Sequence, residues 1–207
     1  MKRSMFAIGI ASFCILAQAA DEPRTWNFNK DKAGEMARGF TNEVGNWIVV
    51  SDRSAPSKGN VLAQTAKNSG STFNLTLVNN TNFKDVNVTV KMKAVAGSED
   101  QGGGLVWRAK DKQNYYVARY NPLEDNYRVY KVQNGQRSEF QSANVKGDKN
   151  WHSLRVTMKG ATIQCFLDGK KYLNVNDNTF SGAGRIGLWT KADAQSNFDD
   201  LAVTKSK

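Results

Sequence analysis

The chain has 207 residues, with 29 Lys and Arg against 19 Asp and Glu, a formal net charge of +10 and one histidine. A net charge this positive is typical of proteins that bind nucleic acid, but the sequence has no basic helix and no zinc-ligand spacing. The single histidine, His152, excludes a multi-histidine zinc site and argues against a histidine-based triad.

The first residues predict a targeting segment. Lys2 and Arg3 are followed by the apolar run Met5 to Leu16 and by the small residues Ala17-Gln18-Ala19, which is the order of a cleaved signal peptide. The apolar run is too short to span a bilayer. We therefore expect a signal peptide over residues 1–19, a single domain over residues 20–207, and a periplasmic or secreted protein with no transmembrane segment after cleavage.

Export of the protein limits which partners its positive charge can indicate and which roles its cysteines can have. Loss of Lys2 and Arg3 reduces 29 basic residues to 27 against 19 acidic ones, a net charge of +8. Nucleic acid is then not expected, and an anionic polysaccharide or the cell envelope is the preferred partner. Cys14 leaves with the signal, so Cys165 has no partner for a disulfide, and its alternating context predicts a small buried hydrophobe.

The rest of the chain predicts an all-β protein. Short runs with period-two alternation follow one another, and turn signals such as Asn134-Gly135 and Asp168-Gly169 separate them. Asp31 to Arg38 is the only stretch that could form a helix. Many short strands at this spacing favour a two-sheet antiparallel β-sandwich. The expected strands are Trp47–Ser51, Val61–Thr65, Thr72–Val78, Val86–Val95, Gly104–Arg108, Tyr115–Tyr120, Tyr127–Val132, Trp151–Lys159, Thr162–Asp168, Lys171–Val175, Gly184–Thr190 and Asn197–Val203.

The stretch Gln101 to Lys131 carries the candidate binding surface. Its three predicted strands alternate apolar residues with aromatic and cationic ones, so one face would present rings next to guanidinium and ammonium groups. Sugars pack their C–H faces on aromatic rings and their hydroxyls on arginine, asparagine and carboxylate groups. About half of these aromatic and cationic side chains are expected in the core instead. The predicted carbohydrate-binding residues are Trp107, Arg108, Tyr116, Arg119, Glu124, Arg128, Lys131 and Trp189. We expect Arg119→Ala or Trp189→Ala to weaken glycan binding with the fold intact.

Two later segments resemble a known superfamily. WHSLRVTMKGATIQCFLDGKKY from Trp151 and GRIGLWTKADAQSNFDDLAV from Gly184 resemble laminin G-like and concanavalin A-like jelly rolls. Trp26, the Gly45-Asn46-Trp47 run and the segment Asn60 to Gln64 resemble its exported bacterial branch, which includes 3-keto-disaccharide hydrolase-like domains. The resemblance implies a concanavalin A-like sandwich over nearly the whole mature chain. It implies little about function, since this fold carries lectins, adhesion modules and glycanases alike.

The acidic residues leave the chemistry open. The Glu-x-Asp-x-x-Glu strand of the superfamily's glycanases is missing, which favours non-catalytic carbohydrate binding over glycosidase activity. An enzyme of the keto-disaccharide type and a structural or protein-binding module remain alternatives. The resemblance also implies a structural calcium as the one candidate cofactor, with Asp199 and Asp200 as ligands and Asn27 or Asn29 joining them.

Overall fold

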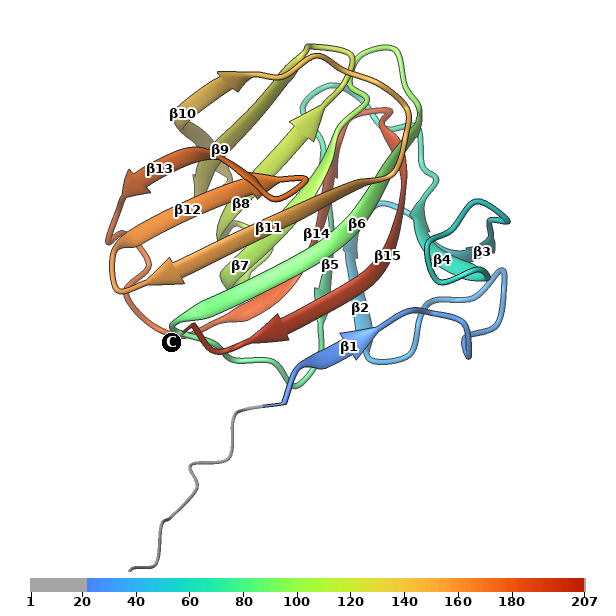
Figure 1. Ribbon diagram of the computed structural model, residues 1–207, viewed down its shortest axis with the longest axis horizontal. Helices are drawn as coiled ribbons and strands as arrows, with labels where there is room; N and C mark the ends of the chain where they lie inside the picture. The colour runs from blue at the N-terminus through green and yellow to red at the C-terminus, as the bar shows by residue number, and fades with distance from the viewer. Residues whose placement is uncertain (1–21, 207) are drawn as a thin grey trace, which may run out of the picture.

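The computed structural model describes residues 22–206 and forms a sandwich of two antiparallel sheets (Figure 1). The first sheet runs β13 (Lys170–Asn176), β12 (Thr162–Leu167), β11 (His152–Lys159), β6 (Val86–Ala96), β15 (Gln195–Thr204), β4 (Asn60–Gln64) and β3 (Trp47–Ser51), and β1 (Arg24–Trp26) pairs with β15. The second sheet runs β10 (Gln136–Asn144), β9 (Asn126–Gln133), β8 (Asn114–Asn121), β7 (Gly103–Asp111), β14 (Arg185–Lys191), β5 (Phe73–Val78) and β2 (Phe40–Val44). We call them the β13–β3 sheet and the β10–β2 sheet.

The predicted all-β sandwich is confirmed, and every predicted strand is present within a few residues of its expected ends. Asp31 to Arg38, the only stretch that could have formed a helix, forms turns instead, and Gly34 has a φ of 86°, far from the right-handed helical value. The strands that the sequence did not predict are β1, β2 and β10. β2 and β10 are the two edges of their sheet, and β1 lies outside the main strand path, so none needs the apolar alternation of a central strand.

The predicted hairpin turns are confirmed by their backbone geometry. Asn134 and Gly135 have φ angles of 51° and 78° between β9 and β10, and Asp168 and Gly169 have 48° and 82° between β12 and β13. Two consecutive residues with positive φ give the turn whose twist matches that of the flanking strands. These turns fix the register of both hairpins.

The main core lies between the two sheets. It contains Val88 and Val156 from one sheet, Trp107 and Tyr116 from the other, and Cys165 from β12. Cys165 is fully buried, and burial raises the pKa of its thiol well above the ordinary value, so the predicted role as a small buried hydrophobe is confirmed.

The structure bears on only one of the two predictions about the membrane and the signal peptide. Over residues 22–206 no helix has the length and apolarity to span a membrane. The predicted signal peptide, residues 1–19, lies outside the described residues.

Candidate carbohydrate-binding face

A second apolar cluster lies on the side of the β10–β2 sheet that faces away from the core. We call this side the Trp189 face. Trp189 is 0% exposed there, although it points away from the sandwich interior, and its indole N–H donates to the Tyr115 hydroxyl at 3.1 Å. The cluster consists of Leu75, Leu77, Val106, Ala109, Tyr115, Val117, Tyr130, Val132 and Trp189, with Phe73 against it.

The burial of this outer cluster requires the sheet to curl over it. The guanidinium of Arg137 on β10 lies 4.5 Å from the ring centre of Tyr130, 5.4 Å from that of Phe73 and 5.8 Å from that of Trp189. β9 and β5 are four strand steps apart, which would be about 19 Å on a flat sheet. One guanidinium can contact rings from both strands only if the sheet bends toward it. The Trp189 face is therefore concave.

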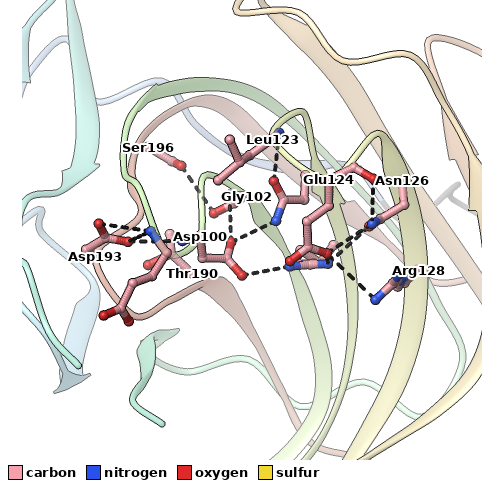
Figure 2. A network of polar contacts seen from close by, with 12 residues as sticks. Asp100, Gly102, Leu123, Glu124, Asn126, Arg128, Thr190, Asp193 and Ser196 are labelled. Atoms are coloured by element: carbon pink, nitrogen blue, oxygen red, sulfur yellow. Dashed lines mark hydrogen bonds and ion pairs between the residues drawn. The ribbon is translucent and has the colours of Figure 1, made fainter. Parts of the chain in front are cut away.

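A buried ion pair forms the polar part of this face. Arg119 on β8 and Asp100 in the loop before β7 are 1% and 0% exposed, and Arg119 Nη1 donates to Asp100 Oδ2 at 2.8 Å. Arg119 Nη2 donates to Glu124 Oε2 at 2.8 Å and to Asn126 Oδ1 at 3.0 Å. Figure 2 shows these groups in one continuous network that ends at Arg128. A charge this deeply buried is tolerated only when it is paired and hydrogen-bonded.

The loop that carries Asp100 is fastened by another carboxylate, at the left of Figure 2. Asp193, between β14 and β15, accepts the backbone N–H groups of Ser98 at 2.7 Å and of Glu99 and Asp100 at 3.0 Å. It also accepts the Ser98 hydroxyl at 2.9 Å. Asp193 therefore fixes the loop, and through Asp100 it fixes the position of the Arg119 guanidinium.

Two carboxylates of this network, Glu124 and Asp193, have strongly lowered pKa values. Burial alone would raise the pKa of Glu124, but hydrogen bonds from Arg119 and Asn126 and the charges of Arg119 and Arg128 lower it to about 2. Burial likewise opposes the shift at Asp193, and the N–H groups of the Ser98–Asp100 loop lower its pKa to about 2.

These shifts predict an acid-sensitive fold. A pKa lowered on folding means that the unfolded chain binds more protons, so the stabilisation is complete above pH 4.5, the ordinary value for Glu, and is lost as the pH falls to about 2. We expect the free energy of unfolding, measured by urea denaturation, to fall across this window. Asp193→Asn should be less stable at pH 7 and should show a shallower fall, whereas an unchanged pH slope would contradict the role given to Asp193.

Above the buried pair lies a more accessible tier. The side chains of Glu124, Arg128 and Glu139 are 38%, 33% and 41% exposed, and Arg128 lies 3.7 Å from Glu124 Oε2 and 3.6 Å from Glu139 Oε2. Three buried polar atoms of the residues on this face have no hydrogen-bond partner among the described residues: Arg119 Nε, Tyr130 OH and Arg137 Nη1. Native proteins leave few such groups unpaired.

The structure brings some of the predicted binding residues together and separates the others. Arg119, Glu124 and Arg128 form the network described above, and Trp189 lies on the same face beneath Arg137. Trp107 and Tyr116 lie on the opposite, core-facing side, where their rings stack at 5.6 Å. The expected surface of rings beside cations is therefore smaller than the sequence suggested.

Arg108 and Lys131 have other partners. Arg108 is 1% exposed and donates to the carbonyl oxygens of Lys84, Phe180 and Gly160, which ties β7 to three loops. Lys131 Nζ donates to Thr179 Oγ1 at 2.8 Å and lies 3.7 Å from Asp177. Neither side chain reaches the Arg119 network.

The predicted calcium ligands lie on β15, and neither contacts the Arg119 network. Asp199 is buried, and its two oxygens accept the backbone N–H groups of Ser57 and Asp200, each at 2.8 Å. Ser57 in turn contacts Asn27 and Asn29, so the expected neighbours are present. Over residues 22–206 no group of three or more His, Cys, Asp or Glu side chains could hold a metal ion. Calcium binding by Asp199 and Asp200 stays a prediction.

Several residues of the face were not predicted. Asp100 lies in a loop, and only the need of a buried arginine for a counter-ion could have indicated it. Arg137 lies on β10, an edge strand whose sequence QRSEFQSAN has no alternating apolar pattern. Asp193 is an ordinary turn residue in sequence, and the four donors it accepts come from a loop more than 90 positions away.

Fold and site together define a concanavalin A-like sandwich with a concave outer face, in which an aromatic cluster lies beneath Arg137. Residues 24–204 match the model of the 3-keto-alpha-glucoside-1,2-lyase-like domain. The chain therefore belongs to that family. A search of the curated proteins finds no match.

Solved structures share the fold at low identity. A carbohydrate-binding module, CBM66 from Bacillus subtilis, is 21% identical with a TM-score of 0.68, over 84% of this chain and 99% of that one. The apo Crh5 transglycosylase is 11% identical with a TM-score of 0.63, over 91% and 86%. The globular domain of T. cruzi calreticulin is 12% identical with a TM-score of 0.56, over 89% and 88%. At these identities the likeness establishes the fold alone.

Proposed function

We propose that this protein binds a carbohydrate on the Trp189 face and that it does so without catalysis, after export to the periplasm or the exterior. The observation that carries the proposal is the geometry of Glu124. Its Oε2 is held by Arg119, Asn126 and Arg128, whereas Oε1 accepts no hydrogen bond within residues 22–206 and the side chain is 38% exposed. A fixed carboxylate with one free oxygen is a ready acceptor for a sugar hydroxyl.

The rest of the face supplies the complementary contacts. Arg128 donates beside Glu124, so one ligand hydroxyl pair can find an acceptor and a donor together. A sugar ring that displaces the half-buried Arg137 guanidinium would stack on Tyr130 and Trp189, as aromatic rings and sugar C–H faces do. The same displacement would give the unpartnered Tyr130 hydroxyl access to the ligand.

The pKa of Glu124 supports binding over catalysis. A general acid or base works best with a pKa near the working pH. At about 2, the pKa of Glu124 keeps the carboxylate ionised and makes it a poor proton acceptor. A permanent anion is instead suited to accepting hydrogen bonds.

Arg128→Ala is expected to weaken glycan binding about tenfold, the equivalent of ~1.4 kcal/mol, because a charge-assisted hydrogen bond is lost. The melting temperature should change little, because the side chain is partly exposed. A broad glycan array identifies the ligand and titration calorimetry measures the affinity. Arg53→Ala, which removes an exposed arginine on the β3–β4 hairpin, is the control. Equal affinity for parent and Arg128→Ala would place the binding face elsewhere.

Family membership favours one second candidate, an enzyme acting on 3-keto-glycosides. Incubation with 3-keto-disaccharides separates the two functions. Turnover by the parent that Glu124→Gln abolishes would establish the enzyme and overturn the non-catalytic proposal.

A further inference from the structure

The outward side of the other sheet, which we call the Arg155 face, concentrates unpaired positive charge. The strands β13, β12, β11, β6 and β15 carry six basic residues and two acidic ones, Asp199 and Asp200. Asp199 is buried, so Asp200, near Lys91, is the only acidic side chain of these strands that reaches solvent. The basic residues are Lys91, Lys93, Arg155, Lys159, Lys170 and Lys171, and none forms an ion pair within the described chain. Lys170 is the register partner of core-facing Leu167, so the other five lie on the Arg155 face.

This distribution contrasts with the Trp189 face. There Arg119, Arg128 and Arg185 each have a carboxylate partner, at 2.8, 3.6 and 3.0 Å in their shortest contacts, and Arg137, which has none, lies over aromatic rings. The net positive charge of the chain is therefore not concentrated around the proposed sugar site. A polyanion would find its complement on the Arg155 face.

Two residue rows cross the Arg155 face at right angles to the strands. In the first, Lys171, Phe166, Arg155 and Thr89 are successive register partners, and the Arg155 guanidinium lies 3.6 Å from the Phe166 ring centre. A stacked guanidinium keeps its N–H edge free for a carboxylate. The second row, one step along, consists of Asn174, Gln164, Thr157, Asn87 and Thr204. Five strands make such a row about 19 Å long.

The second row favours a ligand that also carries hydroxyl groups. Asn87 Oδ1 is buried with no hydrogen-bond partner among the described residues, and an acceptor can be satisfied only by a donor. A shallow depression of about 320 Å³ lies at the second row and is lined by Thr157, Lys159, Thr162, Gln164 and Ser206. The sugar units of a polyuronate carry both hydroxyls that can donate to Asn87 and carboxylates that can pair with the basic residues.

We propose that the Arg155 face binds an anionic polysaccharide of the polyuronate class, independently of the sugar site on the Trp189 face. The carboxylates contact Arg155, Lys171 and Lys159. The hydroxyls contact the Asn–Gln–Thr row. One protein would thereby hold an acidic polymer on one sheet and a second carbohydrate on the other.

The test uses polygalacturonate as the probe, in titrations of the parent at low and at high salt. Arg155→Ala/Lys171→Ala should reduce the affinity at least tenfold at low salt and should flatten the salt dependence, because exposed charges act less as salt screens them. The matched control is Lys30→Ala/Lys112→Ala, which removes two exposed lysines elsewhere and should change the affinity less than twofold. Asn87→Val should weaken binding without altering the salt dependence.

Three results would overturn the proposal: no binding of polygalacturonate by the parent at low salt, an equal loss in the control, or binding only to anionic phospholipid vesicles. The result does not depend on the sugar site, because Arg128→Ala should bind polygalacturonate as the parent does. Failure on the Trp189 face and failure on the Arg155 face are therefore distinguishable.

Discussion

Replacement of Asp100 by alanine is expected to lower the free energy of unfolding by about 3–5 kcal/mol, because it leaves a buried guanidinium without a partner. Arg119 is 1% exposed and Asp100 0%, so water cannot take the place of the lost carboxylate. Glu124 and Asn126 still contact Arg119 Nη2, but Nη1 loses its acceptor. Urea denaturation at pH 7 measures the loss.

Glu35→Ala is the matched control, since Glu35 pairs with Lys32 at 2.6 Å while both side chains are more than half exposed. An exposed pair contributes about 0–1 kcal/mol. Asp100→Leu combined with Arg119→Met should recover part of the loss, because it removes both charges. A loss below that of the control would contradict the importance of the buried pair.

Trp189→Ala is expected to cost about 3–5 kcal/mol, the usual range for an aromatic residue removed from a packed site. The indole is fully buried, lies 5.5 Å from the Phe73 ring and donates its N–H to Tyr115, so its loss leaves a cavity and an unpaired hydroxyl. Urea denaturation against Trp151→Ala, which truncates a half-buried indole bonded to Ser54, provides the comparison. Equal losses would mean that the Trp189 face is not a packed cluster.

These two results revise an expectation drawn from the sequence. Arg119→Ala and Trp189→Ala were expected to weaken binding with the fold intact, but both side chains are buried in the structure. Loss of binding in either variant would therefore report on folding as well as on the ligand. Arg128, which is partly exposed, is the more informative position.

Alternation along the strands made much of the fold predictable. A strand with one buried face repeats its apolar residues every second position, and Val86 to Ala96 shows this pattern in both sequence and burial. Edge strands escape the rule, because β10 buries little and its sequence is almost wholly polar. The Asn-Gly and Asp-Gly turns could also be predicted from the sequence, since few other residue pairs adopt two positive φ angles.

The site was predictable only in part, and for a simple geometric reason. Tyr116 and Arg119 are three positions apart on β8, so their side chains must point to opposite faces, as Arg128 and Lys131 do on β9. Strict application of strand alternation would thus have assigned the two residues of each pair to opposite faces of the sheet. Arg108 could not be placed that way, because β7 is irregular at this point and the residue has a φ of 47°. The contacts of Asp100 and Asp193 depend on tertiary packing, which no local pattern encodes.

The central claim is that a carbohydrate binds on the Trp189 face, and the Nε–Hε signals of the arginines in a ¹⁵N-labelled sample test it most directly. On titration with the best neutral glycan from the array, the signals of Arg119 and Arg128 should shift, while that of Arg155, on the opposite sheet, should stay in place. If the protein is saturated with the glycan and the signals of Arg119 and Arg128 stay in place, the account is contradicted.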